Sequence, residues 1–349
     1  MADRLADVRL APYTTLRVGG PAQAYVEART QDELVEIVAE ADREGEPVLV
    51  LGGGSNIVVS DDGVEGLVVR VVTRGVDVAA EDGRVLVTAQ AGEDWDALVA
   101  RAVGEGWSGV ECLSGVPGLV GSTPIQNVGA YGQDVSQTIT SVRVYDRMTG
   151  ETADLTAAQC GFAYRHSAFK QDPGRHVVLA VTYALDLAEL STPVAYQELA
   201  ARLGVEIGER VPPADARRAV LELRRGKGMV LDPDDPDTRS AGSFFTNPVL
   251  GPADAAELER RAPGHPRWDM PDGSVKVPAA WLIENAGFPK GYEKGGARIS
   301  TKHTLALTNP SGEAGAGDLM ALAREVRDGV REKFGVILVN EPVLVGVTL

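Results

Sequence analysis

The chain has 349 residues, of which 44% are hydrophobic, 24% charged and 5% aromatic. Its length suits about two or three domains, and its composition excludes a largely disordered or collagen-like chain. The formal net charge of −16 and the lack of a basic stripe in the sequence argue against binding to nucleic acid or to an anionic membrane.

The sequence predicts no disulfide framework, metal site or membrane segment. Cys112 and Cys160 are too few for a disulfide framework, neither has a ligand at a zinc-like spacing, and the four histidines are scattered. We expect two reduced core thiols. The amino-terminal sequence lacks an apolar stretch of signal-peptide length, and no run approaches the ~20 apolar residues of a membrane span. A soluble cytoplasmic protein is therefore expected.

The first third of the chain alternates strand and helix patterns. Thr30 and Glu33 form a capping box before a helix with one apolar face. Another helix is expected to begin near Glu93. Strands are predicted at 24–28, 47–51, 57–59, 67–72 and 85–89.

The remaining two thirds mix both patterns, so the expected fold class is α+β. Residues 231–240 are polar and interrupted by proline, which indicates a loop and a domain boundary. The apolar run 336–347, interrupted at 340–342, reads as a closing strand. The other predicted elements are strands at 141–145 and 177–187, a helical region at 193–227, and helices at 253–262, 278–286 and 315–333.

Two glycine-rich segments are the most informative feature. The segment LGGGSN, with glycines at 52–54, follows an apolar strand, and glycines there can take positive φ and turn N–H groups toward an anion. It is neither a Walker A loop nor a G-x-G-x-x-G segment opening a long helix. A tight strand turn is the alternative.

The second segment, 114–132, has five glycines among hydroxyl and amide side chains. This composition suits close backbone approach to a large ligand rich in hydrogen-bonding groups, such as a dinucleotide.

Several segments together resemble the UDP-N-acetylenolpyruvoylglucosamine reductase family. LRVGGP at 16–21, GGGSN at 52–56 and SGVPGLVGSTPIQNVGAYGQ at 114–133 are similar to its FAD-binding region. YRHSAFK at 164–170, AGSFFTNP at 241–248 and NEP at 340–342 are similar to its catalytic segments. The matches follow the family's order from near residue 16 to near residue 346.

The resemblance implies a fold and its domains. Two FAD-binding subdomains of the vanillyl-alcohol-oxidase-like type are expected at 1–75 and 76–226, with 336–349 returning to the first. A smaller α+β substrate-binding domain is expected at 227–335.

The resemblance also implies an activity. Members reduce UDP-N-acetylglucosamine enolpyruvate to UDP-N-acetylmuramate for peptidoglycan, with noncovalent FAD and NADPH as hydride donor. A UDP-sugar is then the small-molecule partner, and no nucleic acid, membrane or obligatory protein partner is implied. The expected FAD contacts are Gly52, Gly53, Gly54, Ser55, Asn56, Ser114, Gly115, Gly118, Gly121, Ser122, Gln126, Asn127, Gly129 and Ala130.

Three residues match the family's catalytic positions. The guanidinium of Arg165 can bind the substrate carboxylate and its developing charge. Ser243 is expected to supply the proton, and Glu341, read as part of an apolar strand, is the second polar group. The alternatives are a surface salt bridge for Arg165, a helix or turn cap for Ser243, and a buried structural pair for Glu341.

Substrate-binding residues follow from the same resemblance. Tyr131 and Tyr196 are expected to contact substrate, the latter from the insertion of the family's long form. Lys227 resembles the lysine that meets the diphosphate, and Asn247 a uridine-side contact. Two departures from the family's pattern weaken the assignment of Lys227 to the diphosphate. The alternative is that Lys227 is an exposed lysine without a specific contact. Many relatives carry a basic residue in place of Thr246, and the loop at 227–243 is longer and more acidic here.

Two other functions remain open from the sequence. One is another noncovalent FAD oxidase or dehydrogenase of the same fold. Many such enzymes tether flavin through His or Cys, and LGGGSN has neither. The other is an inactive nucleotide-binding module.

Overall fold

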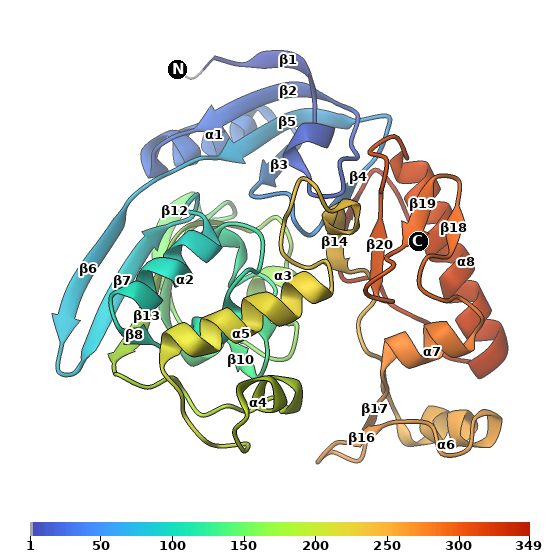
Figure 1. Cartoon of the computed structure of the whole chain (residues 1–349). Coiled ribbons are helices and arrows are strands. Elements are labelled where there is room, and N and C mark those ends of the chain that lie inside the picture. The colour runs from blue at the N-terminus through green and yellow to red at the C-terminus, as the bar shows by residue number, and fades with distance from the viewer. Residues whose placement is uncertain (1–2) are drawn as a thin grey trace. The chain divides into compact units, whose positions relative to one another are not determined.

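The computed structural model describes residues 3–349 and divides into two compact units (Figure 1). The first unit contains the described residues up to Val8, Ala22–Gly53 and Glu65–Gly226. The second contains Arg9–Pro21, Gly54–Val64 and Lys227–Leu349.

The first sheet begins the first unit and has the order β1-β2-β5-β3. Helix α1 (Gln31–Glu44) has the predicted capping box between Thr30 and Glu33, and it ends at Gly45 with a φ of 68°. Its residues Leu34, Val38 and Ala41 are buried, as the apolar face predicted. The strands are β1 (Leu5–Arg9), β2 (Pro21–Ala28), β3 (Val48–Leu51) and β5 (Val64–Val71).

The second sheet has the order β12-β11-β13-β7-β6, with β8 also paired to β13. One hydrophobic core contains residues of both sheets, including Val26 and Leu67 from the first and Val87 and Val181 from the second. The predicted division at 75/76 stays a prediction. The elements are β6 (Val76–Glu81), β7 (Arg84–Gln90), α2 (Trp95–Gly104), β8 (Trp107–Ser108), β11 (Ile139–Asp146), β12 (Glu151–Thr156), α3 (Ala168–Gln171) and β13 (His176–Leu187).

The helical region predicted at 193–227 is two helices, α4 (Gln197–Leu203) and α5 (Pro213–Gly226). Gly204, with a φ of 71°, ends α4. Between the helices the main chain turns back, because Val194 N–H donates to Glu209 O and Gly208 N–H donates to Val194 O. Apolar side chains of both helices pack with Cys112 in a separate small core.

The second unit has helix α8 (Ala316–Phe334) in its core, where eight helix residues are buried. Its sheets have the orders β14-β20-β19-β18 and β15-β17-β16, and β21 pairs in parallel with β4. The other elements are β4 (Ile57–Val59), β14 (Ser240–Ser243), β15 (Val249–Leu250), α6 (Pro252–Arg261), β16 (Trp268–Asp269), β17 (Val275–Lys276), α7 (Ala279–Asn285), β18 (Glu293–Lys294), β19 (Ala297–Ile299), β20 (Ala306–Thr308) and β21 (Val343–Val345).

One prediction about the second unit is wrong in detail. The apolar run 336–347 forms a strand only at Val343–Val345, because Pro342 lacks an N–H and Asn340 is turned to hydrogen-bond its carbonyl. The segment 231–240 is largely a loop, as predicted, with one short helical turn at Pro236–Thr238, and it is partly internal. Its Asp237 is buried, where it accepts hydrogen bonds from Thr301 N–H (3.1 Å) and Arg298 (3.2 Å).

Across residues 3–349, no helix is both long and apolar enough to cross a membrane. Cys112 and Cys160 are buried free thiols, as predicted. Burial raises the pKa of Cys112 to about 12 and that of Cys160 to about 11.

Asp146 lies at the end of β11 and links this strand to the segment before β13. Its carboxylate accepts hydrogen bonds from Arg175 Nε (3.1 Å) and Nη2 (2.7 Å) and from Met148 N–H (2.9 Å). The hydrogen bond from Arg175 is the main reason that the pKa of Asp146 falls from 3.8 to about 2.

Asp146→Asn should lower the free energy of unfolding at pH 7 by about 1–2 kcal/mol. Since the folded pKa is depressed, the wild-type advantage is present above about pH 4 and is lost as pH falls through about 2. Urea unfolding should therefore show a difference at pH 3 of roughly half that at pH 7. Asp154→Asn, which removes an exposed pair with Arg143, is the control. Equal losses at both pH values would contradict the assignment.

Candidate active site

The segment 52–53 of the first unit meets the second glycine segment with no room for a side chain. A Cβ on Gly53 would lie 2.9 Å from Gly118 Cα, and one on Gly52 would lie 2.8 Å from Ser122 Oγ. Positive φ does not explain the glycines at 52 and 53, because among the three glycines at 52–54 only Gly54 has a positive φ. The sequence-based argument from φ is thus wrong for Gly52 and Gly53, which are required by close approach.

The rest of that segment belongs to the second unit. Gly54 has a φ of 62°, and a Cβ there would lie 1.9 Å from Tyr13 O. Its carbonyl accepts from Thr15 N–H at 3.0 Å. Ser55 and Asn56 are half-buried, and Asn56 O accepts from the N–H of Val343.

Part of the second glycine segment is held by the protein itself. Ser114 is fully buried and its hydroxyl donates to Glu111 O at 2.6 Å, while Gly121 N–H donates to Ala91 O at 2.9 Å. Other members of the segment are half-exposed: Gly118, Ser122, Gly129 and Ala130. The segment therefore combines an anchored beginning with residues that solvent, or a ligand, can reach.

Asp96 fixes the start of this segment, and sequence reasoning missed it. Its carboxylate accepts from Gly115 N–H (2.6 Å) and from both Nη atoms of Arg217 on α5 (2.6 and 3.0 Å). Burial alone would raise the pKa of Asp96, but these hydrogen bonds hold it below its ordinary value. An Asp in the first turn of a helix is common, so the sequence held no signal for this contact.

Arg165 is tied to the same segment. Its Nη2 donates to Gly129 O at 2.8 Å and its Nη1 to Asn127 O at 3.4 Å. Both Arg165 (φ 52°) and Asn127 (φ 43°) adopt left-handed backbone conformations. Lys170 Nζ donates to Arg165 O (3.1 Å) and Gln126 Oε1 (3.2 Å). The guanidinium is thus oriented by main-chain carbonyls.

Tyr131 and Tyr196 lie together in the first unit. Their rings form an edge-to-face pair with centroids 5.3 Å apart. Tyr196 is 43% exposed and immediately precedes α4. Tyr131 has a φ of 49° and immediately precedes Gly132, where a Cβ would lie 2.9 Å from Ala195 Cβ. The structure brings these two predicted substrate contacts together.

Ser243 and Glu341 lie on neighbouring segments of the second unit. Glu341 N–H donates to Phe244 O at 2.8 Å, and Phe245 pairs with Asn340 in an isolated bridge. Ser243 is the last residue of β14, so it does not cap a helix, and the alternative of a turn cap stays open. Glu341 is half-buried and precedes β21, so the expectation that it lies within a strand is also wrong.

The remaining predicted substrate contacts lie elsewhere in the second unit. Asn247 Oδ1 accepts from the N–H of Ala279 at the start of α7 (2.9 Å), which leaves its Nδ2 to point elsewhere. Lys227 is half-buried and adjoins Gly228, where a Cβ would lie 3.1 Å from Asp237 Cβ. The roles assigned to Lys227 and Asn247, like those of the other site residues, stay predictions.

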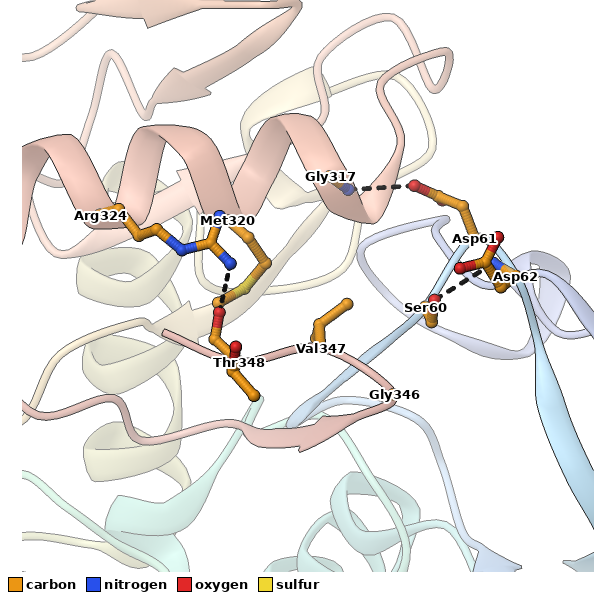
Figure 2. A pocket seen from close by; sticks show the side chains of 9 residues that line it. All are labelled: Ser60, Asp61, Asp62, Gly317, Met320, Arg324, Gly346, Val347 and Thr348. Atoms are coloured by element: carbon orange, nitrogen blue, oxygen red, sulfur yellow. Dashed lines mark hydrogen bonds between the residues drawn. The ribbon is translucent and has the colours of Figure 1, made fainter.

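A polar pocket also occurs in the second unit, at the amino-terminal end of α8 (Figure 2). Asp61 accepts from Ala316 N–H (2.8 Å) and Gly317 N–H (3.0 Å), and Arg324 donates to Thr348 O. Within the described part of the chain, none of the predicted site residues lines this pocket.

Gly53→Ala should weaken FAD binding by about tenfold or more, because its Cβ forces the two glycine segments apart. Gly104→Ala is the matched control, since nothing lies within 4 Å of a Cβ there and its φ is ordinary. Fluorescence titration of the flavin-free variants measures both affinities. Equal affinities in the two variants would show that the contact with Gly118 is unimportant for the cofactor.

Two protein-family models match the chain. The model described as an FAD binding domain matches residues 22–156. The model described as UDP-N-acetylenolpyruvoylglucosamine reductase, C-terminal domain, matches residues 234–345. Together with the observed helices and strands, they confirm an α+β fold that contains an FAD-binding domain.

Relatives and a solved structure extend this likeness to the whole chain. UDP-N-acetylenolpyruvoylglucosamine reductase of Streptomyces coelicolor is 56% identical over 99% of this chain and 91% of its own length. The protein of that name from Thermobifida fusca is 56% identical over 98% of each chain. The crystal structure of UDP-N-acetylenolpyruvylglucosamine reductase from Thermus caldophilus aligns with a TM-score of 0.67 at 27% identity over 99% of both chains. The chain therefore belongs to the UDP-N-acetylenolpyruvoylglucosamine reductase family.

Proposed function

We propose that this protein reduces UDP-N-acetylglucosamine enolpyruvate to UDP-N-acetylmuramate for peptidoglycan synthesis, with bound FAD and with NADPH as hydride donor. Full-length identity of 56% to a reductase of that name carries the proposal. The pairing of the Ser243 and Glu341 segments supports it, because it assembles two of the required polar groups independently of any ligand.

The glycine segments of the first unit fit a dinucleotide cofactor. Side chains are excluded where Gly53 meets Gly118, so only main chain is presented there, and backbone N–H groups suit a diphosphate. Gly53, Gly118, Ser122 and Gly129 are the half-exposed members that would hold it. When bound, FAD accepts hydride from NADPH and donates it to the enolpyruvyl methylene.

Arg165 would bind the substrate carboxylate. Addition of hydride pushes negative charge into this group as an enolate, and a guanidinium donates two parallel hydrogen bonds to such a group. The carbonyls of Asn127 and Gly129 hold the guanidinium in place before substrate arrives. This arrangement avoids the cost of ordering a long side chain during the reaction.

Ser243 would donate a proton to the carbon beside the new methyl group. The main-chain bond between Phe244 and Glu341 keeps the Glu341 carboxyl on the segment next to the serine. Glu341 would orient the reacting group, and the serine hydroxyl would regain its proton from solvent. Such positioned proton transfer accelerates a reaction by about 10²- to 10⁴-fold.

The finer assignments are part of the same proposal. Tyr131, Tyr196, Lys227 and Asn247 would contact the UDP-sugar, and residues 227–335 would form most of the substrate-binding domain. Residues 1–75 with 336–349, and residues 76–226, would form the FAD-binding subdomains. We also propose a cytoplasmic protein that needs no nucleic acid, membrane or protein partner for this reaction.

The purified protein should be yellow, and trichloroacetic acid should release the colour into the supernatant. In an anaerobic stopped-flow experiment, NADPH should bleach the flavin absorbance, and UDP-N-acetylglucosamine enolpyruvate should then restore it. Bleaching of the oxidised flavin by simple alcohols or hydroxy acids, together with no restoration by this sugar, would favour an oxidase or dehydrogenase. Colourless protein that takes up no FAD would favour an inactive module.

Ser243→Ala should leave bleaching by NADPH nearly unchanged and should slow restoration by the sugar at least about 10²-fold, since only the second step needs this proton. Ser243→Cys keeps a donor of similar size and should recover part of the rate. Ser274→Ala, which removes an exposed hydroxyl bonded to Asp272, is the control in the same unit. Equal slowing of both steps would make Ser243 a structural residue. An unaffected second step would move the donor role to Glu341 or an ordered water.

A further inference from the structure

Glu111 is a fully buried carboxylate in the short helix Glu111–Leu113 of the first unit. Its Oε2 accepts from Gly109 N–H at 2.6 Å. Its Oε1 accepts from Thr192 N–H at 2.7 Å, from Thr192 Oγ1 at 3.1 Å and, more weakly, from Ser108 Oγ at 3.4 Å. Burying a carboxylate is costly unless hydrogen-bond donors satisfy it. These hydrogen bonds therefore hold the segment around Thr192 against the segment 108–111.

Gln133 closes the arrangement into a ring. Its Nε2 donates to Thr192 Oγ1 at 2.5 Å, and its Oε1 accepts from Cys112 N–H at 2.7 Å. Because an amide nitrogen only donates and a carboxylate only accepts, the Thr192 hydroxyl must accept from Gln133 and donate to Glu111. We call Glu111, Thr192 and Gln133 the anchor network.

The anchor network requires a carboxylate at position 111. A glutamine would present an NH₂ group either to Gly109 N–H or to Thr192 N–H, and both of these groups are donors. One buried donor would then face another. Position 111 therefore needs two acceptor oxygens, and a side chain of similar size alone would not replace Glu111.

The network joins the two segments that carry the tyrosine pair. Gln133 follows Tyr131 by two residues, and Thr192 precedes Tyr196 by four. On either side of Thr192, main-chain hydrogen bonds hold the segment, from Ser191 N–H to Val211 O and from Val194 N–H to Glu209 O. Near the tyrosines, the two segments meet at Gly132 and Ala195, where a further methyl group has no room.

We infer that the anchor network is a positioning device for Tyr131 and Tyr196. It sets the separation of the two rings, and so the shape of the surface they offer to the UDP-sugar, without touching substrate. This inference rests on the proposed function of the protein, and it adds Glu111, Gln133 and Thr192 as positioning residues.

Thr192→Val keeps the backbone N–H and removes the hydroxyl from the network, so it is the first variant to test. The KM for UDP-N-acetylglucosamine enolpyruvate should rise by about 5- to 30-fold, while flavin content and bleaching by NADPH stay at wild-type levels. Thr192→Ser restores the hydroxyl and should restore most of the KM. Thr140→Val, which removes a hydroxyl bonded to Thr182 O outside the network, is the control.

Amide hydrogen exchange gives a readout that does not depend on turnover. Thr192→Val should lose protection at 191–196 and at 131–133 and keep it in the strands β7, β11 and β13. Glu111→Gln should show the same pattern more strongly, with less stable protein as its expected side effect.

Three outcomes would overturn the inference. The first is a wild-type KM in Thr192→Val, and the second is an equal KM in the Val and Ser variants. The third is a parallel loss of flavin and of both half-reactions, which would make the network purely structural. If the wild-type protein itself does not respond to the sugar, the proposed function fails, and the assignment of these residues to substrate binding fails with it.

Discussion

Close contact between main chains is the constraint on which the first unit depends. Where Gly53 passes Gly118, the separation leaves no room for a Cβ, so two segments 65 residues apart in the sequence touch through backbone alone. Asp96 then fixes the start of the second segment through Gly115, and Arg165 is fixed at its other end through Gly129. The proposed cofactor-binding surface and the proposed cationic group therefore share one support.

In the second unit, main-chain contacts bring two proposed catalytic residues together. Ser243 and Glu341 are brought together by the hydrogen bond from Glu341 N–H to Phe244 O and by the Phe245–Asn340 bridge, and β21 continues the pairing onto β4. Main-chain bonds of this kind tolerate changes in the intervening side chains.

Local sequence patterns predicted helices and strands well where residues close together in the sequence determine the element. The Thr30–Glu33 capping box starts α1, and the strand predicted at 177–187 is the long strand β13. The closing strand was predicted too long, because hydropathy does not register the loss of an N–H at Pro342 or the side-chain bond of Asn340. The break between α4 and α5 has local signals that the single helical prediction overlooked, because Gly204 ends α4 with a φ of 71° and α5 begins at Pro213. Only the backbone pairing of Val194 with Glu209 lies beyond a local pattern.

For the site, sequence motifs identified the segments but not what holds them. Ordered matches selected Arg165, Ser243 and Glu341, yet Asp96 and Glu111 belong to no motif. Gln133 ends the matched segment 114–133, but no role followed from the match, since its partner Thr192 lies 59 residues away. The glycines at 52–53 were selected for the wrong reason, because φ is a local property whereas close approach is a property of the fold.

The left-handed conformations of Asn127, Tyr131 and Arg165 have an evolutionary consequence. A non-glycine residue in this region carries strain of about 1–3 kcal/mol at most sites, less for asparagine. Three such residues gather around one stretch of chain, where glycine would relax the backbone but would remove the ring, the amide or the guanidinium. Selection for thermal robustness and selection for turnover should thus pull in opposite directions at these positions, and lineages that grow hot must find their extra stability elsewhere in the fold.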